Sequence, residues 1–479
     1  MKKALAMGLG ALLAAGSAAP AFAASQIDFS GYYRMYFSNL WNNNYSSSDA
    51  RTSDSAFSNR LQMDFGFHAT DEISVFWRLR APSAQRWGTN DLPVITQWIY
   101  GRIQQDWGTV TIGRLPNSSL FNGLSNLGWQ PKGADGSGDY TLVNPFDFLD
   151  DPADGIRYAN RWDNGFQIVA QFNRLSTRQS SEWNGASWVA GDEEFADLFV
   201  LEPAYFWDGG GATLGLNFLR DRARTSTYGN DDPVDKRGTY ADRPALKAFY
   251  INPAVSHRWD NGFAIHFEGK AGWGTDDNVA SGQNGRKLDG YAFYLDFDYN
   301  YGPGNLNLAG WWASGDDGGE KRNDLVGMGA EFKPLLIAYG SNISPRVRTD
   351  GGNAVARAND RSGAAGNKGA FGGGVFGGNQ DQSNHWVINL NGNHKFTDDI
   401  SVTYALAYLA LNKTKPGAKK DIGWEADLSF QFQLLDNLRF GTSFGYLFAG
   451  KALNDTTDGV VNVKASDTYG WFNTLTFSF

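Results

Sequence analysis

Arginine residues recur on one side of several short segments in the first part of the chain, and they are the residues best placed to act on a solute. Within these segments apolar and polar residues alternate, and the arginines occupy the polar positions. A guanidinium group stays charged at any physiological pH, so arginines gathered along one surface attract anions and order water. The residues concerned are Arg34, Arg60, Arg78, Arg80, Arg102, Arg157 and Arg161.

The sequence offers no comparable set for catalysis or for metal binding. Its 5 histidines fall in separate segments, without the spacing of zinc ligands and without an inferable arrangement of serine, histidine and aspartate. We therefore expect a protein that is not an enzyme and that uses no cofactor and no metal ion. A net charge of −9 also argues against nucleic acid as a partner.

The segments that carry the arginines have the pattern of β-strands. In residues 26–38, apolar residues such as Ile27 lie on one face and Arg34 lies on the other, which is the period-two alternation of a half-apolar strand. Residues 465–479 show the same alternation and end on Phe479. No apolar stretch after the amino-terminal segment approaches the ~18 to 20 residues that a membrane helix needs.

Short turns alternate with long polar segments along the whole chain. The hexapeptide RWDNGF at 161–166 recurs letter for letter at 258–263, and Asn-Gly favours the positive φ angles of a tight hairpin turn. This alternation is typical of outer-membrane barrels, whose short turns are periplasmic. It predicts an all-β protein, an antiparallel up-and-down transmembrane β-barrel. An arginine facing the bilayer midplane costs about 2–4 kcal/mol in such a barrel, so we expect the arginines to face the lumen.

The alternating segments amount to about 18 strands, within a range of 16 to 20. The ambiguity lies in residues 325–332 and 335–340, which are short and lack clean alternation. They could be two further spanning strands or a hairpin inside an external loop, and we favour the loop.

The amino terminus has the features of a secretory signal peptide at residues 1–23. Lys2 and Lys3 precede an apolar run that ends in small residues up to Ala23. Cleavage there leaves residues 24–479, in which no linker divides the strand-like segments, so we expect a single domain. Because the chain has no cysteine, we expect neither a disulfide nor an acylated cysteine anchor. The predicted location is the bacterial outer membrane.

The segment WGTVTIGR at 107–114, a long acidic loop at 115–154 and the segment GIRY at 155–158 resemble the trimeric general porins of Gram-negative outer membranes. Among these, the chain is most similar to the homotrimeric porins of sulfate-reducing bacteria. The resemblance implies that loop 115–154 folds into the lumen as a constriction loop, with its acidic residues opposite arginines of the wall. The implied acidic residues are Asp147, Asp150, Asp151 and Asp154, and the implied basic residues are Arg34, Arg60, Arg78, Arg80, Arg102 and Arg157.

The predicted function is that of a porin, a water-filled channel for passive diffusion of small hydrophilic solutes and ions. The resemblance implies a homotrimer embedded in outer-membrane lipid. An alternative is a channel selective for a sugar or an anionic oligosaccharide, because inward aromatic residues could guide sugars. An outer-membrane hydrolase is less favoured. The aromatic residues concerned are Tyr32, Tyr36, Trp98, Tyr100 and Tyr294.

Two further features remain open from the sequence. Arg114 has the parity of Val110 and Ile112, so it would need a β-bulge at Gly113 to reach the lumen. Residues 341–383 are rich in glycine and are expected to form a flexible external loop.

Overall fold

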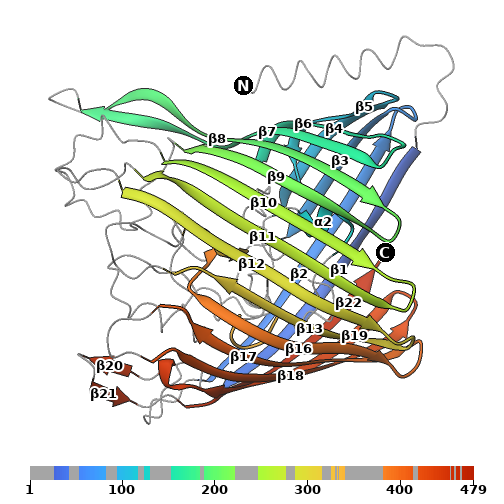
Figure 1. The fold of residues 1–479 in the computed structure, drawn as a ribbon. Helices are drawn as coiled ribbons and strands as arrows, with labels where there is room; N and C mark the ends of the chain where they lie inside the picture. The colour runs from blue at the N-terminus through green and yellow to red at the C-terminus, as the bar shows by residue number, and fades with distance from the viewer. Residues whose placement is uncertain are drawn as a thin grey trace.

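The computed structural model shows one antiparallel barrel of 18 strands (Figure 1). The structure describes residues 26–41, 53–81, 94–116, 123–129, 153–183, 188–221, 246–276, 286–315, 325–329, 332, 334–339, 381–413, 419–453, 455–457, 460–463 and 466–479. The predicted signal peptide and most of the glycine-rich loop lie outside these residues.

The barrel strands follow one another around the wall in chain order. Their number and up-and-down order confirm the predicted fold. They are β1 (Gln26–Trp41), β2 (Ser53–His68), β3 (Ile73–Ala81), β4 (Ile95–Gln105), β5 (Gly108–Leu115), β6 (Ala153–Arg161), β7 (Phe166–Trp183), β8 (Trp188–Trp207), β9 (Gly210–Asp221), β10 (Leu246–Arg258), β11 (Phe263–Asp276), β12 (Arg286–Asn300), β13 (Gly304–Ala313), β16 (His385–Lys395), β17 (Ile400–Leu411), β18 (Asp421–Leu435), β19 (Leu438–Ala449) and β22 (Thr468–Ser478).

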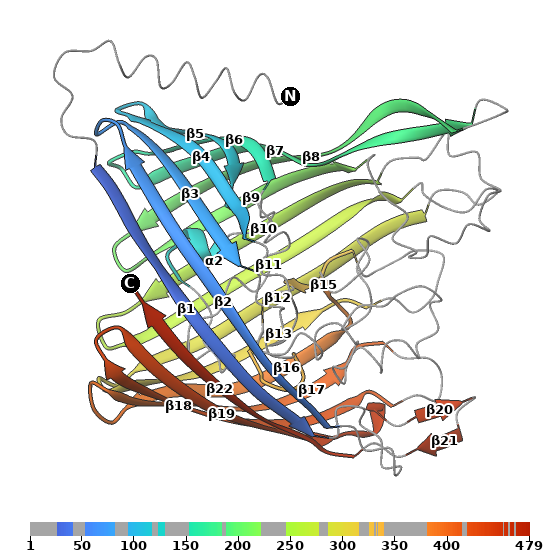
Figure 2. The same cartoon turned by 180° about the vertical axis from the view of Figure 1, so that it is seen from behind.

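The first and last strands close the barrel. β1 pairs with β22 from Tyr32 opposite Ser478 to Trp41 opposite Tyr469, and the two strands lie side by side in Figure 2. The backbone of Gly31 exchanges hydrogen bonds of 2.8 and 3.0 Å with the backbone of the final residue, Phe479. The last strand therefore completes the ring of backbone hydrogen bonds, as its alternation predicts.

Tight turns join the strands at one end of the barrel, which we call the short-turn end. In the repeated hexapeptide, Asn164 and Asn261 each accept a hydrogen bond of 3.0 Å from the backbone two residues later. The following residues, Gly165 and Gly262, both have φ of 85°. The two copies thus form the same turn, which confirms the predicted positive φ for the glycines but not for Asn164 and Asn261. The opposite end is the long-loop end.

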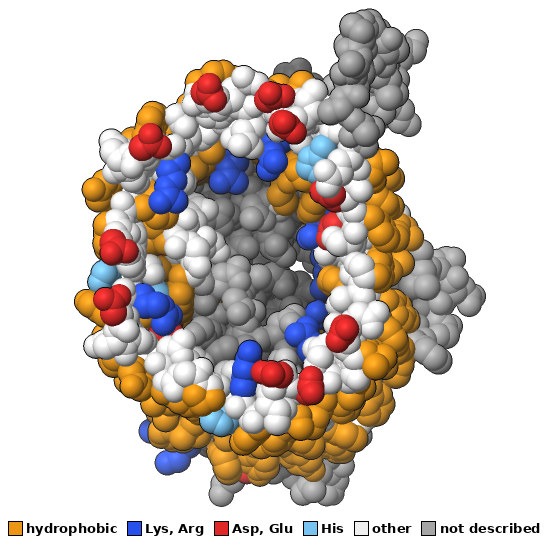
Figure 3. All heavy atoms as spheres, turned by 90° about the vertical axis from the view of Figure 1, so that its right-hand side faces the viewer, with side chains coloured by type: hydrophobic (Ala, Val, Ile, Leu, Met, Phe, Trp, Pro, Cys, Tyr) orange, Lys and Arg blue, Asp and Glu red, His pale blue; other side chains and the backbone are white. Residues whose placement is uncertain are grey.

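The outward face of the barrel is apolar, as Figure 3 shows from the short-turn end. Large side chains such as Ile99, Ile112 and Ile156 are 40%, 50% and 51% exposed there. Aromatic residues gather at both borders of this apolar surface. Near the short-turn end they include Trp107, Trp162, Tyr205, Trp259 and Tyr299, and near the long-loop end Trp41, Trp386, Tyr408, Trp424, Tyr446 and Tyr469.

Two segments outside the barrel strands pack against the inner wall. The short helix α2 (Gly123–Asn126) lies inside the barrel against β9, β10 and β11. Residues 325–328 and 334–339 are buried, and the two-residue strand β14 (Met328–Gly329) pairs with β15 (Asp381–Gln382). The interpretation of 325–340 as loop rather than spanning strands is confirmed. The expected hairpin is wrong, because β14 pairs with β15 and the segment packs into the lumen.

Three small elements complete the described structure at the long-loop end. They are η2 (Lys451–Leu453), a single turn of 3₁₀ helix, and the paired strands β20 (Asp455–Thr457) and β21 (Val460–Val463).

We predict that Gly262→Ala destabilises the barrel more than Gly302→Ala. Both glycines have positive φ, 85° and 95°, so either alanine incurs the left-handed cost of roughly 1–2 kcal/mol. A Cβ at Gly262 would also meet the Asn300 carbonyl oxygen at 2.5 Å, whereas one at Gly302 would have nothing within 4 Å. Urea unfolding in detergent micelles measures the difference. Equal destabilisation by the two variants would contradict this account of the turn.

Candidate functional site

The arginines singled out from the sequence lie on the inward-facing side of strands β1, β2, β3, β4 and β6. Their parity is opposite to that of exposed outward residues such as Phe29, Ile99 and Ile156. Arg34 is only 8% exposed. Basic side chains are visible around the bore in Figure 3. We call this set the arginine wall, and its members are Arg34, Arg60, Arg78, Arg80, Arg102 and Arg157.

Aromatic rings and polar side chains hold members of the arginine wall in place. Arg78 forms an ion pair with Asp64 on the neighbouring strand, with Nη2 2.9 Å from Oδ2, and lies 4.8 Å over the ring of Trp98. Arg102 lies 4.9 Å over the ring of Phe76. Stacking of this kind packs the face of a guanidinium group and leaves its edge to bind a carboxylate or an anion, as the edge of Arg78 binds Asp64.

Arg34 joins the wall at the closure of the barrel. Its Nε donates a 3.0 Å hydrogen bond to Thr476 on the last strand, and Nη1 lies 3.4 Å from the Tyr36 hydroxyl. Directly opposite, on β2, stands Arg60. Like charges that face each other across a ladder repel. Because the two positive charges add, this part of the wall is strongly electropositive.

Of the four acidic residues implied by the family resemblance, the structure describes only Asp154. Asp147, Asp150 and Asp151 lie outside the described residues. Asp154 belongs to β6, where its parity is that of outward-facing Ile156, and its side chain is 68% exposed. It therefore points away from the lumen, contrary to the prediction. The physical reason is that the strand already begins at Ala153, so parity fixes the direction of Asp154.

Arg114 lies opposite Asp154 and also faces outward. β4 and β5 pair without a register shift, and Arg114 stands across from Ile99, so Gly113 forms no bulge that would turn it inward. Its Nη1 is 4.0 Å from Asp154 Oδ1 and its Nε donates to the carbonyl oxygen of Gln97 at 3.2 Å.

Inward carboxylates that we did not single out from the sequence lie on β8 and β11. Glu268 on β11 accepts a 3.1 Å hydrogen bond from the backbone of Leu124 in α2, and Glu202 on β8 accepts one from the Asn126 side chain. Thr213 also donates to Glu202, at 2.9 Å. These carboxylates fasten the described part of loop 115–154 to the wall.

A second pair of inward carboxylates on β18 holds the segment 334–339. Asp427 accepts a 3.1 Å hydrogen bond from the backbone N–H of Leu336. Glu425 accepts hydrogen bonds from the backbone of Ile337 and, at 2.8 Å, of Ala338. Both carboxylates are almost fully buried, at 0% and 4% exposure. Successive N–H groups converging on carboxylate oxygens anchor a loop strongly, because the acceptor carries the charge that each donor needs.

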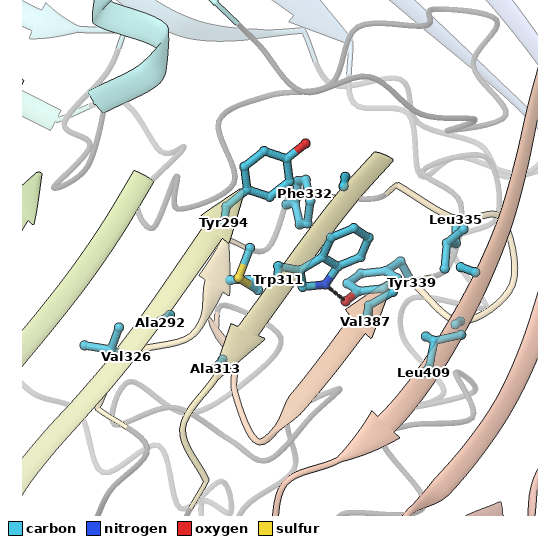
Figure 4. Packing of buried hydrophobic residues seen from close by; sticks show 14 of the residues in the cluster. Ala292, Tyr294, Trp311, Ala313, Val326, Phe332, Leu335, Tyr339, Val387 and Leu409 are labelled. Carbon is cyan, nitrogen blue, oxygen red and sulfur yellow. Dashed lines mark hydrogen bonds between the residues drawn. The ribbon is translucent and has the colours of Figure 1, made fainter. Parts of the chain in front are cut away.

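Aromatic packing fixes the same segment from its other side (Figure 4). Phe332 and Tyr339 make edge contacts with Trp311 on β13, at centroid distances of 5.2 and 5.9 Å. Trp311 Nε1 donates to the Tyr339 hydroxyl, which lies 2.6 Å from Nε2 of His385. Burial raises the pKa of the Tyr339 hydroxyl well above its ordinary value, so the hydroxyl stays protonated. It donates a hydrogen bond to Nε2 of His385, whose Nδ1 faces the carbonyl oxygen of Ser383.

Glycines in the wall allow the segment to approach the sheet. Gly272 on β11 stands directly opposite Gly290 on β12. A Cβ at Gly272 would lie 2.8 Å from Cγ2 of Val326, and one at Gly290 would lie 2.5 Å from its backbone nitrogen. The facing glycines form a recess in the wall that accommodates Val326. A larger residue at either position would displace Val326 from this recess.

The inserted segments therefore occupy the side of the lumen lined by β8–β13 and β16–β18, and the arginine wall lines the remaining side. The sequence did carry a signal for the anchors, since Glu425 and Asp427 occupy inward positions of a well-patterned strand. Parity alone does not tell whether an inward carboxylate faces water or backbone N–H groups.

The described residues show neither a metal centre nor a spanning helix. Among them, no group of three or more histidine, cysteine, aspartate or glutamate side chains is placed to hold a metal ion. No helix in the described ranges is long and apolar enough to cross a membrane. His266 instead packs in the wall, with its ring 4.0 Å from that of Trp129 and Nδ1 2.8 Å from the Ser256 hydroxyl.

The fold and the site define a closed β-barrel with a polar, arginine-lined lumen. The outer membrane protein OpdK of Pseudomonas aeruginosa is 12% identical, with 96% of this chain and 100% of OpdK covered and a TM-score of 0.50. OccK2 (OpdF) of the same organism is 13% identical over 94% and 98% of the two chains, with a TM-score of 0.48. OmpT of Vibrio cholerae, in its trimer form, is 12% identical over 95% and 100%, with a TM-score of 0.40.

At these identities the similarity concerns the fold alone. No family model matches the chain, and no curated protein sequence matches it.

We predict that Glu425→Ala loosens the segment 334–339. The variant removes the acceptors of the Ile337 and Ala338 N–H groups, and each buried donor left without an acceptor costs about 1–3 kcal/mol. Hydrogen–deuterium exchange of these amides should accelerate by roughly 5- to 150-fold. Ser429→Ala, at an inward position of the same strand, serves as the control and should leave the exchange unchanged. Unaltered exchange in Glu425→Ala would show that the carboxylate does not anchor the segment.

Proposed function

We propose that the protein is an outer-membrane channel of the porin type, through which small hydrophilic solutes and ions diffuse passively. The single observation that carries the proposal is the division of one closed barrel into an apolar outward face, bordered by aromatic residues, and an inward face with the arginine wall. A face of this kind suits acyl chains, with Trp and Tyr at the head-group levels, while charged residues require water inside.

The proposed orientation places the short-turn end in the periplasm and the long-loop end outside the cell. This arrangement is general among bacterial outer-membrane barrels. The predicted signal peptide at residues 1–23, which would direct export, supports the same location.

The arginine wall is proposed to favour anions. Arg102 and Arg157 both stand opposite Thr111, one on each side of β5, so their charges act on the same stretch of the lumen. On β8, β11 and β18, the described carboxylates Glu202, Glu268 and Glu425 accept hydrogen bonds from the inserted segments. A permeating ion would therefore meet fixed positive charge on one wall, which raises the local concentration of anions.

A channel selective for an acidic sugar is the second candidate. The observation in its favour is the alternation of arginines with inward aromatic rings on β3 and β4, where Phe76 and Tyr100 stack at 5.3 Å and Trp98 lies 5.4 Å from Tyr100. Rings bind the apolar faces of sugars, and guanidinium groups bind carboxylates. Blockade of the open channel by glucuronate but not by glucose would favour this candidate over the general porin.

The homotrimer implied by the family resemblance is retained as part of the proposal. Three chains in the native mass spectrum of detergent-extracted protein would support it, and a single chain would contradict it.

The function is tested by reconstitution in a planar bilayer with a KCl gradient. We expect stepwise conductance and a reversal potential of the sign that marks anion preference. Arg102→Gln/Arg157→Gln should lower the ratio of anion to cation permeability about two- to fivefold, because each charge contributes on the order of 0.5 kcal/mol at several ångströms in water.

The control is Lys419→Gln/Lys420→Gln, which removes the same charge at the long-loop end, before β18. This control should change the permeability ratio less than the arginine variant. Absence of conductance from folded, inserted wild-type protein would overturn the proposed function. Equal effects of the two variants would show that the arginine wall does not set selectivity.

A further inference from the structure

Charged residues occupy the outward face of five neighbouring strands near the long-loop end. They stand in register across β6 to β10 as Asp154, Arg174, Asp197, Arg220 and Lys247. We call them the charged row. At a similar distance from the short turns, strands β16–β19 instead carry outward Trp and Tyr residues. This part of the barrel surface therefore presents ionic groups where β16–β19 present an aromatic border.

The outward direction of the charged row follows from strand parity. Asp154, Asp197 and Arg220 each lie two residues from an exposed apolar side chain. These neighbours are Ile156, Phe199 and Phe218, which are 51%, 46% and 38% exposed. The row thus lies on the outward face, directly above the apolar surface.

The charges of the row do not cancel. Arg174 and Asp197 form an ion pair of 2.9 Å, and Arg174 is also stacked on Phe195 at 3.8 Å. Arg220 and Lys247 stand directly opposite each other on β9 and β10, and in the described part of the chain Arg220 Nε has no hydrogen-bond partner. Two cations facing each other repel unless an anion lies between them.

An apolar groove of about 630 Å³ lies directly beneath the charged row, on the same outward face. The next layer of residues forms its upper wall, in which Phe172, Phe199 and Phe218 contact one another at centroid distances of 5.2 and 6.3 Å. In the layer below, Ala170, Leu201 and Leu216 stand opposite one another on neighbouring strands, and all three line the groove. The small side chain of Ala170 leaves the space that the neighbouring rings enclose.

We propose that the groove and the charged row bind a phosphorylated, acylated glycolipid of the outer leaflet. An acyl chain would lie in the groove past Ala170, and a phosphate would bind between Arg220 and Lys247. Phosphate accepts several charge-assisted hydrogen bonds and would remove the repulsion between the two cations. This inference rests on the proposed function only for the orientation of the barrel, with its long-loop end in the outer leaflet.

Charge complementarity favours a lipid over a second copy of this chain. The facing cations require an anion, and the outward faces of β16–β19 at the same level carry aromatic residues such as Trp424 and Tyr446. Those residues would cover an apolar groove but would bring no anion to Arg220 and Lys247, whose nearest carboxylate in the row is Asp197, on the other side of Arg220. An amphiphile with an anionic head group and acyl chains satisfies both parts of the surface at once.

The test is native mass spectrometry of the detergent-solubilised full-length protein, titrated with bis-phosphorylated lipid A or with phosphatidylcholine. We expect the wild type to retain lipid A preferentially. Arg220→Gln/Lys247→Gln should weaken lipid A binding at least about tenfold, because it removes both cationic donors to the phosphate. Ala170→Phe, which fills the groove, should weaken it as well, and Lys419→Gln/Lys420→Gln should not.

Several results would overturn the inference. They are equal retention of lipid A and phosphatidylcholine, unchanged binding in Arg220→Gln/Lys247→Gln, and binding of glucosamine 1-phosphate as tight as that of lipid A. Protein–protein complexes that Ala170→Phe dissociates would assign the groove to a contact between copies and would also contradict it. Channel conductance in Arg220→Gln/Lys247→Gln should equal that of the wild type. A barrel that binds lipid A without conducting would defeat the proposed function and leave this inference standing.

Discussion

Closure of the sheet is the constraint on which the rest of the structure depends. A strand that faces hydrocarbon must pair its backbone N–H and C=O groups on both sides, and only a closed ring leaves no open edge. Here the pairing of β1 with β22 supplies that closure. Once the ring is closed, strand parity assigns every side chain to the outside or the inside. The apolar outward face, the inward arginines and the outward charged row are all consequences of that assignment.

The inward face carries two sets of charged side chains, arginines and carboxylates, with different contacts. The arginine wall on β1–β4 and β6 is held by rings and by Asp64. The carboxylates Glu268 and Glu425 on β11 and β18 instead accept backbone N–H groups of segments that fold back into the barrel. A barrel of 18 strands encloses more space than its own side chains fill, and these anchored segments reduce the open cross-section. Among the described residues, these anchored segments pack against strands other than those of the arginine wall.

The strands and turns could be predicted from the sequence because their signals are local. Alternation over a segment such as 26–38 and the Asn-Gly pairs at 164 and 261 each specify a conformation without reference to distant residues. The inward direction of the arginines followed from the same parity. The predicted inward direction of Asp154 was wrong, because the sequence does not mark where the loop ends and β6 begins.

The filling of the lumen could not be predicted, because it depends on contacts between residues far apart in the chain. The burial of residues 334–339 depends on Glu425 and Asp427, some ninety positions later, and on the facing glycines Gly272 and Gly290. None of these residues has a local pattern that distinguishes an anchor from an ordinary inward polar residue. For the apolar run at 335–338, the sequence therefore favoured a loop but left a spanning strand open as the alternative.

The central claim is that the arginine wall borders water and that the opposite parity borders lipid. The chain has no cysteine, so single cysteines introduced on one strand can report both faces. Arg102→Cys and Ile99→Cys, both on β4, would be treated in the membrane with a charged, water-soluble thiol reagent. The account predicts fast modification at position 102, with a drop in conductance, and protection at position 99. Protection at 102 with fast modification at 99 would contradict it.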